Sequence, residues 1–380
     1  MRNQSVFVKA NLLSNGIKID NSVLNNFKEE LFVEKRRAFG NQDPKKYLQL
    51  SIPQEIYILP DDVICAVNVK DSSTWRLIFE NENYYVTDGN QKFGVKFPKR
   101  PLFYDKQMSL YPKINVNQIL TLYGGNCLGI FANRFCSYAP DNICHFCSLT
   151  HNHGKENNFL DIITPDVMND ALNIALNENY SIKQIAITGG IYKNLDENFE
   201  YFFQLAYKAR QTLDKMQRSN LDILLVISPP TNKNLLKKFK GLKVKVAMDL
   251  EVYRKDLFQK YCPGKDKFTG YEHFIESLIY LVDIMGYGNV YSLFVGGLEP
   301  ISSLKQGAEF LASHGIVPVV NVLHVDPETK MTEKDKPSVD YILKSGEILQ
   351  NLYSKYKFEP FYNHCGRNSL DTEAYQKMFY

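Results

Sequence analysis

The chain has 380 residues, of which 44% are hydrophobic and 13% aromatic, so it can fill a sizeable core and is neither a disordered nor a fibrous protein. Its 45 basic and 42 acidic side chains leave a formal charge of +3, which does not favour nucleic acid or an anionic membrane as a partner. We expect a small-molecule substrate, or else a protein substrate.

The first sixteen residues contain no apolar core of signal-peptide length and no small-residue cleavage site, which predicts a cytoplasmic protein. The most apolar long stretch, 277–298, is interrupted by Asp283, Gly286 and Gly288, and this pattern favours a helix, a turn and a strand over a membrane span. The seven cysteines are odd in number. Without an export signal they indicate metal binding or catalysis rather than a disulfide framework.

The first part of the chain, 1–107, predicts a small α+β accessory domain. A helical stretch at 22–37 precedes short β-rich runs separated by turn residues such as Gly89 and Asn90, a pattern typical of antiparallel strands. The expected strands are 55–59, 63–69, 75–80, 84–87 and 93–97.

The middle of the chain, 108–330, alternates short apolar runs with longer amphipathic ones, which predicts parallel strands joined by helices. This pattern fits an open doubly wound sheet or a full or partial barrel, and in each case the chemistry belongs at the carboxyl ends of the strands. The charged, Tyr-rich residues 331–380 form a C-terminal extension. The expected strands are 128–132, 184–188, 221–227, 244–248, 290–295 and 316–323, and the main helices 166–177, 198–216 and 271–285.

Four cysteines lie close together near the first strand of this series: Cys127, Cys136, Cys144 and Cys147. Three thiolates on one loop bind soft metals or iron and sulfur, so zinc and iron-sulfur are both open at this point. A structural zinc site takes four ligands, usually as two close pairs. Cys127 and Cys136, nine residues apart, make a poor close pair.

A zinc site could instead combine Cys144 and Cys147 with His151 and His153. Almost no sequence separates these two pairs, which leaves no room for a finger fold. Three cysteines that hold a four-iron cluster leave one iron without a protein ligand, and a small molecule can coordinate there. An arrangement with such an open iron atom is typical of a catalytic site.

An aromatic residue, Phe146, stands directly before the last cysteine of a loop that follows the first strand of a βα barrel. In this the sequence resembles the radical S-adenosylmethionine (SAM) enzymes, in particular their biotin-synthase-like branch. The usual spacing in that superfamily is C-x3-C-x2-C, whereas Cys136, Cys144 and Cys147 give C-x7-C-x2-C. We prefer Cys136 to Cys127 as the first ligand because Cys127 lies at or before the start of the expected strand. The resemblance covers about 125–331 and implies a partial (β/α)6 TIM-like barrel.

Further motifs follow in the order that this resemblance implies. Gly189 and Gly190 end the second strand where the superfamily has Gly-Gly-Glu, with Ile191 in the acidic position. Glu251 resembles the polar residue of the fourth strand, and the turn at 296–299 resembles the one that flanks adenine after the fifth. The cofactor-binding residues implied are Phe146, Thr188, Gly189, Gly190, Ser228, Glu251, Gly296, Gly297 and Glu299.

The sixth strand and the C-terminal extension supply candidate substrate contacts. Asn321 and His324 lie at the end of that strand, although His324 is equally well interpreted as a core histidine. Cys365 and Arg367 belong to a polar cluster, 363–369, that either caps the barrel mouth or forms a loop before a helical stretch at 371–379.

The resemblance implies that Cys136, Cys144 and Cys147 hold a 4Fe-4S cluster whose open iron binds SAM. Reductive cleavage of SAM would yield a 5'-deoxyadenosyl radical that abstracts hydrogen from a substrate, with electrons from a flavodoxin- or ferredoxin-like donor. Cofactor maturation or methyl transfer are alternatives within the same class. A rival from another class is a non-catalytic protein in which Cys127 and these three cysteines bind zinc or a closed cluster. The sequence does not identify the substrate.

Two remaining motifs have ordinary structural interpretations. Gly264 and Lys265 do not form a phosphate-binding loop, because Asp266 replaces the hydroxyl residue and the upstream glycine is missing. Cys262 and Cys65 are expected to be buried structural residues.

Overall fold

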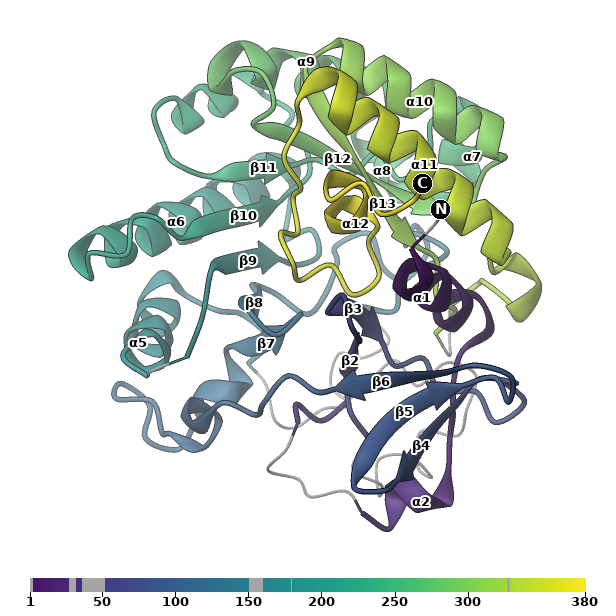
Figure 1. Ribbon diagram of the computed structural model, residues 1–380. Helices are drawn as coiled ribbons and strands as arrows, with labels where there is room; N and C mark the ends of the chain where they lie inside the picture. Colours follow the sequence, from purple (N-terminus) through teal and green to yellow (C-terminus); the bar gives the residue numbers. More distant parts are fainter. Residues whose placement is uncertain (1–2, 27–31, 36–51, 150–159, 179, 327–328) are drawn as a thin grey trace. The chain divides into compact units, whose positions relative to one another are not determined.

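The computed structural model describes residues 3–26, 32–35, 52–149, 160–178, 180–326 and 329–380 (Figure 1). Contacts divide the chain into two compact units. The first comprises Met1–Arg100, Val295–Lys305 and Val320–Tyr380, and the second comprises Pro101–Phe294 and Gln306–Val319. The expected domains 1–107, 108–330 and 331–380 stay a prediction.

The central sheet of the described chain has seven strands in the order β13-β12-β11-β10-β9-β8-β7 and curls into a half barrel. Neighbours from β8 to β12 pair in parallel, whereas β7 is antiparallel to β8. The predicted partial barrel is therefore confirmed, and the short strand β7 is an addition to it. The strands are β7 (Thr121–Tyr123), β8 (Cys127–Phe131), β9 (Gln184–Thr188), β10 (Asp222–Val226), β11 (Lys245–Ala247), β12 (Val290–Gly296) and β13 (Ile316–Val322).

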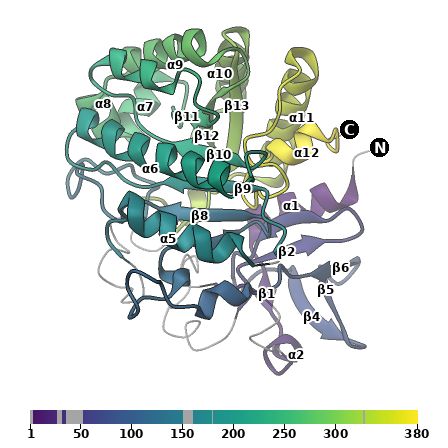
Figure 2. The same cartoon turned by 90° about the vertical axis from the view of Figure 1, so that its left-hand side faces the viewer.

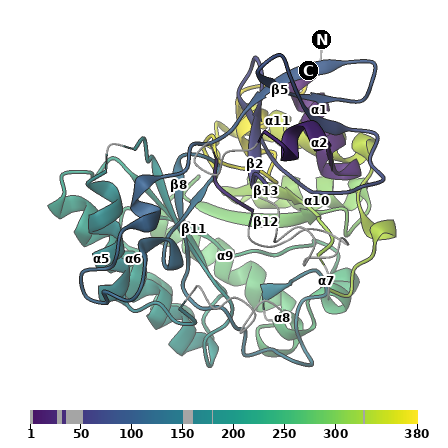
Figure 3. The same cartoon turned by 90° about the horizontal axis from the view of Figure 1, so that it is seen from below.

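Helices follow the strands as the alternating pattern predicted. Within the second unit, α5 and α6 lie side by side against the outside of the sheet (Figure 2), whereas α7 packs against α8 (Figure 3) and α9 packs against η4. Phe199 and Phe202 of α6 are fully buried, and the side chains of Thr164 and Asn194 cap α5 and α6. The helices are α5 (Pro165–Leu176), α6 (Leu195–Lys215), α7 (Lys255–Tyr261), α8 (Pro263–Phe268), α9 (Tyr271–Met285) and α10 (Ile301–Ser313), with 3-10 turns η2 (Leu102–Asp105), η3 (Val116–Gln118) and η4 (Lys233–Phe239).

The first unit contains a second sheet, in the order β1-β4-β5-β6-β2-β3, whose hairpins confirm the predicted N-terminal strands. Helix α1 packs against β2, β3 and α11, and α11 packs against α12. None of the described helices is long and apolar enough to cross a membrane. The elements are α1 (Gln4–Asn15), β1 (Lys18–Ile19), α2 (Asn21–Leu24), β2 (Glu55–Ile58), β3 (Val63–Ala66), β4 (Arg76–Glu80), β5 (Asn83–Thr87), β6 (Lys92–Lys96), η5 (Glu333–Asp335), α11 (Val339–Tyr356) and α12 (Asp371–Tyr375).

The structure corrects one expected helix in this unit. The stretch 22–37 was expected to be helical, but α2 ends at Leu24, and Glu34 forms a β-bridge with Pro53. Asn25 and Asn26 follow α2 and are poor helix formers, which agrees with its early end. Residues 27–31 and 36–37 lie outside the described part of the chain.

The end of the chain adds a short antiparallel segment beside β13. The amide of Val322 donates to the carbonyl of Asn368 at 2.9 Å, and the amide of Leu370 donates to the carbonyl of Val320 at 3.1 Å. Asn321 and Ser369 are therefore paired across this bridge. The polar cluster 363–369 thus continues into strand pairing at the sheet edge, and helix α12 begins directly after it.

Candidate functional site

The cysteine loop leaves the carboxyl end of β8 and is anchored to the loop that follows β9. The amide of Ala132 donates to the carbonyl of Thr188 at 2.7 Å and the amide of Ser137 donates to the carbonyl of Ile191 at 2.8 Å, so the end of β9 and the loop after it hold the start of the cysteine loop. A turn in which the amide of Cys147 donates to the carbonyl of Cys144 at 3.1 Å holds the last two cysteines together. All of these residues belong to the second unit.

The three thiols of this loop influence one another electrostatically. Burial raises the pKa of Cys136, and the negative charge of Cys144 raises it further. The same two causes raise the pKa of Cys147 to about 12. The thiols are therefore close enough that their thiolate forms repel one another. Cys136, Cys144 and Cys147 could hold iron as thiolates, and the positive charge of the iron would offset this repulsion.

The described residues contain no group of three or more Cys, His, Asp or Glu side chains that could hold a single metal ion. A four-iron cluster takes each thiolate on a different iron atom, so its ligands need not meet at one point. Residues His151 and His153 of the zinc alternative lie outside the described residues.

Cys127 lies at the opposite end of β8 from the loop. It is the first residue of that strand and is fully buried. Four residue steps of about 3.3 Å place roughly 13 Å of strand between Cys127 and Phe131. This separation argues against one metal ion held by all four cysteines.

The paired glycines after β9 approach the cysteine loop very closely. A Cβ atom on Gly189 would lie 2.3 Å from Oδ1 of Asn133, and one on Gly190 would lie 2.1 Å from the carbonyl oxygen of Phe135 and 2.9 Å from the Cβ of Cys136. Only glycine fits this contact. That the glycines admit a ligand stays a prediction; in the structure they let the first cysteine lie against the end of β9.

A buried ion pair lies at the end of β11. Nζ of Lys265 donates to Oε1 of Glu251 at 2.6 Å and to the carbonyl oxygen of Asp249 at 2.5 Å. The side chains of Lys265 and Glu251 are only 12% and 13% exposed. Glu251 has a φ of 69°, a left-handed conformation that costs energy in a residue with a side chain. The fold therefore holds this carboxylate in a strained and specific position.

The charges of Lys265 and Glu251 also influence the pKa values of the cysteines. Burial lowers the pKa of Lys265, but the negative charges of Glu251 and Cys144 outweigh it and raise that pKa overall. A hydrogen bond from Cys262 and the charge of Lys265 lower the pKa of Cys144 against the effect of burial. Burial and the charge of Glu251 raise the pKa of Asp249 to about 7. Glu251 is therefore close to two of the predicted ligands, Cys144 and Cys147, since its charge acts on both.

Lys265 and Cys262 are functional-site residues that the sequence analysis missed. It interpreted both as structural, but the carbonyl of Tyr261 accepts from the amide of His145 at 2.9 Å, inside the cysteine loop. The signal was indirect: buried carboxylates such as Asp249 and Glu251 require a cationic partner. Nothing in the spacing identified which lysine would supply it.

Two buried acceptors at the strand ends have no hydrogen-bond partner among the described residues: Oδ1 of Asn133, after β8, and Oδ1 of Asp249, after β11. Buried polar atoms normally have partners, so these oxygens fit a ligand that brings hydrogen-bond donors. The amino group and ribose hydroxyls of SAM are such donors. The residues present therefore fit both a three-cysteine cluster and SAM.

The other predicted residues of the second unit have simpler surroundings. Thr188 ends β9, and its carbonyl accepts the bond from Ala132 already described. Phe146 is half-buried between Cys144 and Cys147 in the loop, and Ser228 is buried just beyond the end of β10.

The remaining predicted residues belong to the first unit. Gly296 ends β12, and Gly297 follows with a φ of 115° and packs against Pro337, whose Cδ would lie 2.9 Å from an added Cβ. Glu299 is buried and accepts from Oγ of Ser303 at 2.5 Å. Its carboxylate is thus engaged at the start of α10.

Asn321 and His324 lie at the end of β13. Oδ1 of Asn321 is buried without a hydrogen-bond partner among the described residues, as is Oδ1 of the nearby Asn368. Nε2 of His324 lies 3.4 Å from Oδ2 of Asp326. These two amide oxygens can accept from a ligand, which suits the predicted substrate role of Asn321.

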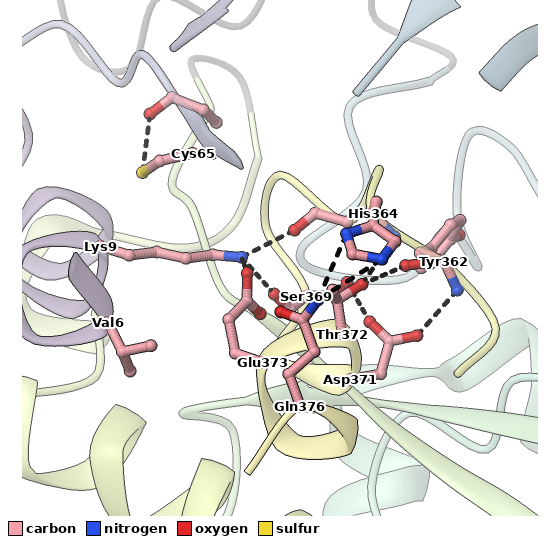
Figure 4. A network of polar contacts seen from close by, with 12 residues as sticks. Val6, Lys9, Cys65, Tyr362, His364, Ser369, Asp371, Thr372, Glu373 and Gln376 are labelled. Atoms are coloured by element: carbon pink, nitrogen blue, oxygen red, sulfur yellow. Dashed lines mark hydrogen bonds and ion pairs between the residues drawn. The ribbon is translucent and has the colours of Figure 1, made fainter. Parts of the chain in front are cut away.

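The C-terminal cluster is tied into the first unit. Nη1 of Arg367 donates to Oε2 of Glu55 at 3.3 Å, and Cys365 is fully buried. Figure 4 shows the adjoining network, in which Lys9 reaches from α1 to the carbonyl of Ser369 and to Glu373. Arg367 thus has a carboxylate partner within this unit and Cys365 is buried there, and their predicted contact with substrate stays a prediction.

Comparisons with known proteins give partial matches. The chain is 30% identical over 141 residues to the bacteriochlorophyllide c C-7(1)-hydroxylase of Chlorobaculum limnaeum, and the match covers 37% of this chain and 35% of that protein. The chain therefore spans about a third of that relative. No protein-family profile matches it.

Three solved structures with a similar fold illustrate the structural matches. A radical SAM methyltransferase from Sphaerobacter thermophilus gives a TM-score of 0.46 at 16% identity, with 61% of this chain and 66% of that chain covered. The FeFe-hydrogenase maturase HydG from Carboxydothermus hydrogenoformans gives 0.42 at 13% identity, with 65% and 59% covered. The radical SAM methyltransferase TsrM from Kitasatospora setae, with cobalamin and a [4Fe-4S] cluster bound, gives 0.39 at 12% identity, with 60% and 42% covered.

Proposed function

We propose that this chain, a member of the radical SAM superfamily, binds a 4Fe-4S cluster through Cys136, Cys144 and Cys147 and cleaves SAM reductively to start hydrogen abstraction from a small molecule. One observation carries the proposal. Three mutually interacting thiols, a glycine pair and a buried Glu251–Lys265 pair occur beyond the carboxyl ends of the parallel strands β8, β9 and β11 within one compact unit. Ligand sites of βα barrels lie at that end of the strands.

Each group of the site has a separate task in this proposal. When bound, the cluster would supply the electron that converts SAM into methionine and a 5'-deoxyadenosyl radical. The three thiolates hold it, and the glycines fix Cys136 against β9. The unpartnered oxygens of Asn133 and Asp249 accept hydrogen bonds from SAM. The buried position of the strand ends keeps water away from the radical.

Reductive cleavage of SAM needs a source of electrons. We propose a low-potential donor of the flavodoxin or ferredoxin type. The similarity to a carbon hydroxylase supports activation of a C–H bond over methyl transfer, because hydroxylation at carbon begins with that bond.

The test is anaerobic reconstitution with iron and sulfide, reduction with dithionite and chromatography of the SAM products. We expect 5'-deoxyadenosine from the unaltered chain and its loss, by about a hundredfold or more, in Cys144→Ala, because removing a ligand costs more than the roughly 10–100-fold lost when a partner of a ligand is removed. Cys127→Ala is the matched control. It removes a buried cysteine at the start of β8, the strand that leads into the cysteine loop. This change should leave both the cluster and the 5'-deoxyadenosine product unchanged.

Two results would contradict the proposal. One is a protein that holds zinc and leaves SAM intact. The other is loss of the metal in Cys127→Ala as well as in Cys144→Ala, which would identify a closed four-cysteine site without catalysis.

A further inference from the structure

The turn between α7 and α8 packs against the cysteine loop. Its residues run from Tyr261, the last residue of α7, through Cys262 and Gly264 to Lys265 in the first turn of α8. The amide of Cys262 donates to Phe258 at 2.8 Å, and the carbonyl of Cys262 accepts from Asp266 at 3.0 Å. Both sides of Cys262 are therefore fixed by helix hydrogen bonds, and its thiol has a defined position.

Two backbone contacts hold this turn against the cysteine loop. The amide of His145, the neighbour of Cys144, donates to the carbonyl of Tyr261 at 2.9 Å. A Cβ on Gly264 would lie 2.4 Å from the ring of Tyr138 and 2.5 Å from the carbonyl oxygen of Asn142. Any residue other than glycine would push the turn away from the loop. The close approach is thus built into the backbone.

Two side chains of this turn act on Cys144. Cys262 is fully buried and follows Tyr261, which the amide of His145 contacts, and hydrogen bonding to Cys262 lowers the pKa of the Cys144 thiol. The ammonium group of Lys265 acts on Cys144 through its charge, and Glu251 and the carbonyl of Asp249 hold it in place. None of the three cluster ligands proposed above lies on this turn. In the proposed function, Cys262 and Lys265 lie beside the ligand Cys144 and are not ligands themselves.

We infer that Cys262 and Lys265 are positioning residues that set the reduction potential of the cluster: the Cys262 thiol donates a hydrogen bond to the ligating sulfur of Cys144, and Lys265 supplies a fixed positive charge beside it. Hydrogen bonds to the sulfurs and the net charge nearby are among the groups that determine the potential of a protein-bound cluster. Both groups stabilise the reduced form, which carries one more negative charge. The inference rests on the proposed function, since it requires the cluster at Cys136, Cys144 and Cys147.

The experiment is an anaerobic redox titration of the reconstituted protein followed by electron paramagnetic resonance, without SAM or substrate. Cys262→Ala removes the donor and Lys265→Met removes the charge at nearly constant volume. We expect each change to lower the ratio of reduced to oxidised cluster about tenfold at a fixed applied potential, because a hydrogen bond to a charged group has a strength of this order. For a one-electron couple this is a shift of about 59 mV to more negative potential.

The conservative variants provide the controls. Cys262→Ser keeps a donor and Lys265→Arg keeps the charge, so both should titrate close to the unaltered protein. Wild-type potentials in Cys262→Ala and Lys265→Met, with four irons still bound, would overturn the inference and leave the proposed function intact. Loss of the cluster in Cys262→Ala would also overturn it, by identifying Cys262 as a ligand.

A failure of the proposed function has a different signature. If the unaltered chain assembles no four-iron cluster, the proposed function and this inference both fall. If Lys265→Met does not fold because Glu251 loses its partner, Cys262→Ala decides the outcome, since a small neutral side chain is removed there without a charge being left unpaired.

Discussion

At the scale of single residues, Asp249 links the site to the pH dependence of stability. Burial and the neighbouring Glu251 raise its pKa from 3.8 to about 7. The folded chain therefore keeps this proton up to about pH 7, whereas the unfolded chain loses it near pH 4. The contribution to stability is full below about pH 4 and is lost as the pH rises through 7.

Asp249→Asn should remove this dependence. We expect the variant to gain unfolding free energy relative to the unaltered chain as the pH rises from 4 to 8, by about 1.4 kcal/mol for each unit of pKa difference. Urea unfolding of the cluster-free protein at several pH values measures the difference. Parallel curves for the two proteins would show that the Asp249 proton does not contribute.

Gly190 gives a second prediction at this scale. An added Cβ would lie 2.1 Å from the backbone oxygen of Phe135, and backbone cannot move aside as a flexible side chain can. Overpacking of this kind costs about 1–3 kcal/mol. Gly190→Ala should displace Cys136 and lower the bound iron, while far-ultraviolet circular dichroism stays unchanged.

The control for this change is Gly94→Ala in β6, where the nearest atom to an added Cβ is the flexible end of Leu59 at 3.3 Å. It should bind iron like the unaltered chain. Full iron binding by Gly190→Ala would contradict the packing argument.

At the scale of elements, the junction of α1 and α12 depends on one buried charge. Nζ of Lys9 lies 2.7 Å from Oε1 of Glu373, with side-chain exposures of 1% and 2%, and also donates to Gly366 and Ser369 (Figure 4). Removing one partner of a buried pair leaves the other charge uncompensated and costs about 3–5 kcal/mol. We expect a loss of this size in Lys9→Met, measured by chemical denaturation.

The exposed pair between Lys193 and Glu197 is the comparison. It lies on the surface at the start of α6, with both side chains about half exposed, where such pairs add little. Lys193→Met should leave the denaturation curve unchanged. Equal effects of Lys9→Met and Lys193→Met would show that burial of the Lys9 pair has no special effect.

Some elements could be predicted from the sequence because their hydrophobic pattern is clear, and others could not because that pattern is masked or too short. The strands of the half barrel are buried on both faces and therefore read as apolar runs, and 184–188 and 271–285 match β9 and α9 to the residue. Helix α11 was missed because its charged and tyrosine residues masked the spacing of Ile342, Leu349 and Leu352. Strand β7 has three residues, too few to show a period.

Sequence analysis identified site residues only where these residues follow predicted strands. Cys136, Cys144, Cys147 and the glycine pair occupy such positions and were singled out. Cys262 and Lys265 come after a helix, and they meet the cysteine loop through a contact between two loops. No local pattern encodes such a tertiary contact, so only the structure revealed it.

At the scale of the whole molecule, the first unit combines segments from both ends of the chain. Besides the Lys9 contacts, Oγ of Ser14 donates to Pro337 and Lys70 pairs with Glu333, each at 2.8 Å. A chain shortened to residues 101–380 loses every one of these partners. We expect limited trypsin digestion to cleave its last sixty residues at lysines that the full chain protects.

Residues 1–100 supplied as a separate chain should restore that protection, because the missing contacts are not covalent. Equal digestion of the short and full chains would contradict the shared packing of these segments.

The pairing of Lys9 with Glu373, 364 positions apart, also has a consequence for how the protein is made. A ribosome adds about 5–20 residues each second, so the partner of the Lys9 ammonium emerges roughly 20–70 seconds after it. During that interval α1 cannot bury its lysine, while the cysteine loop and the strands that anchor it already exist. The cysteine loop and the strands β8 and β9 can therefore fold before the Lys9 ammonium acquires its buried partner.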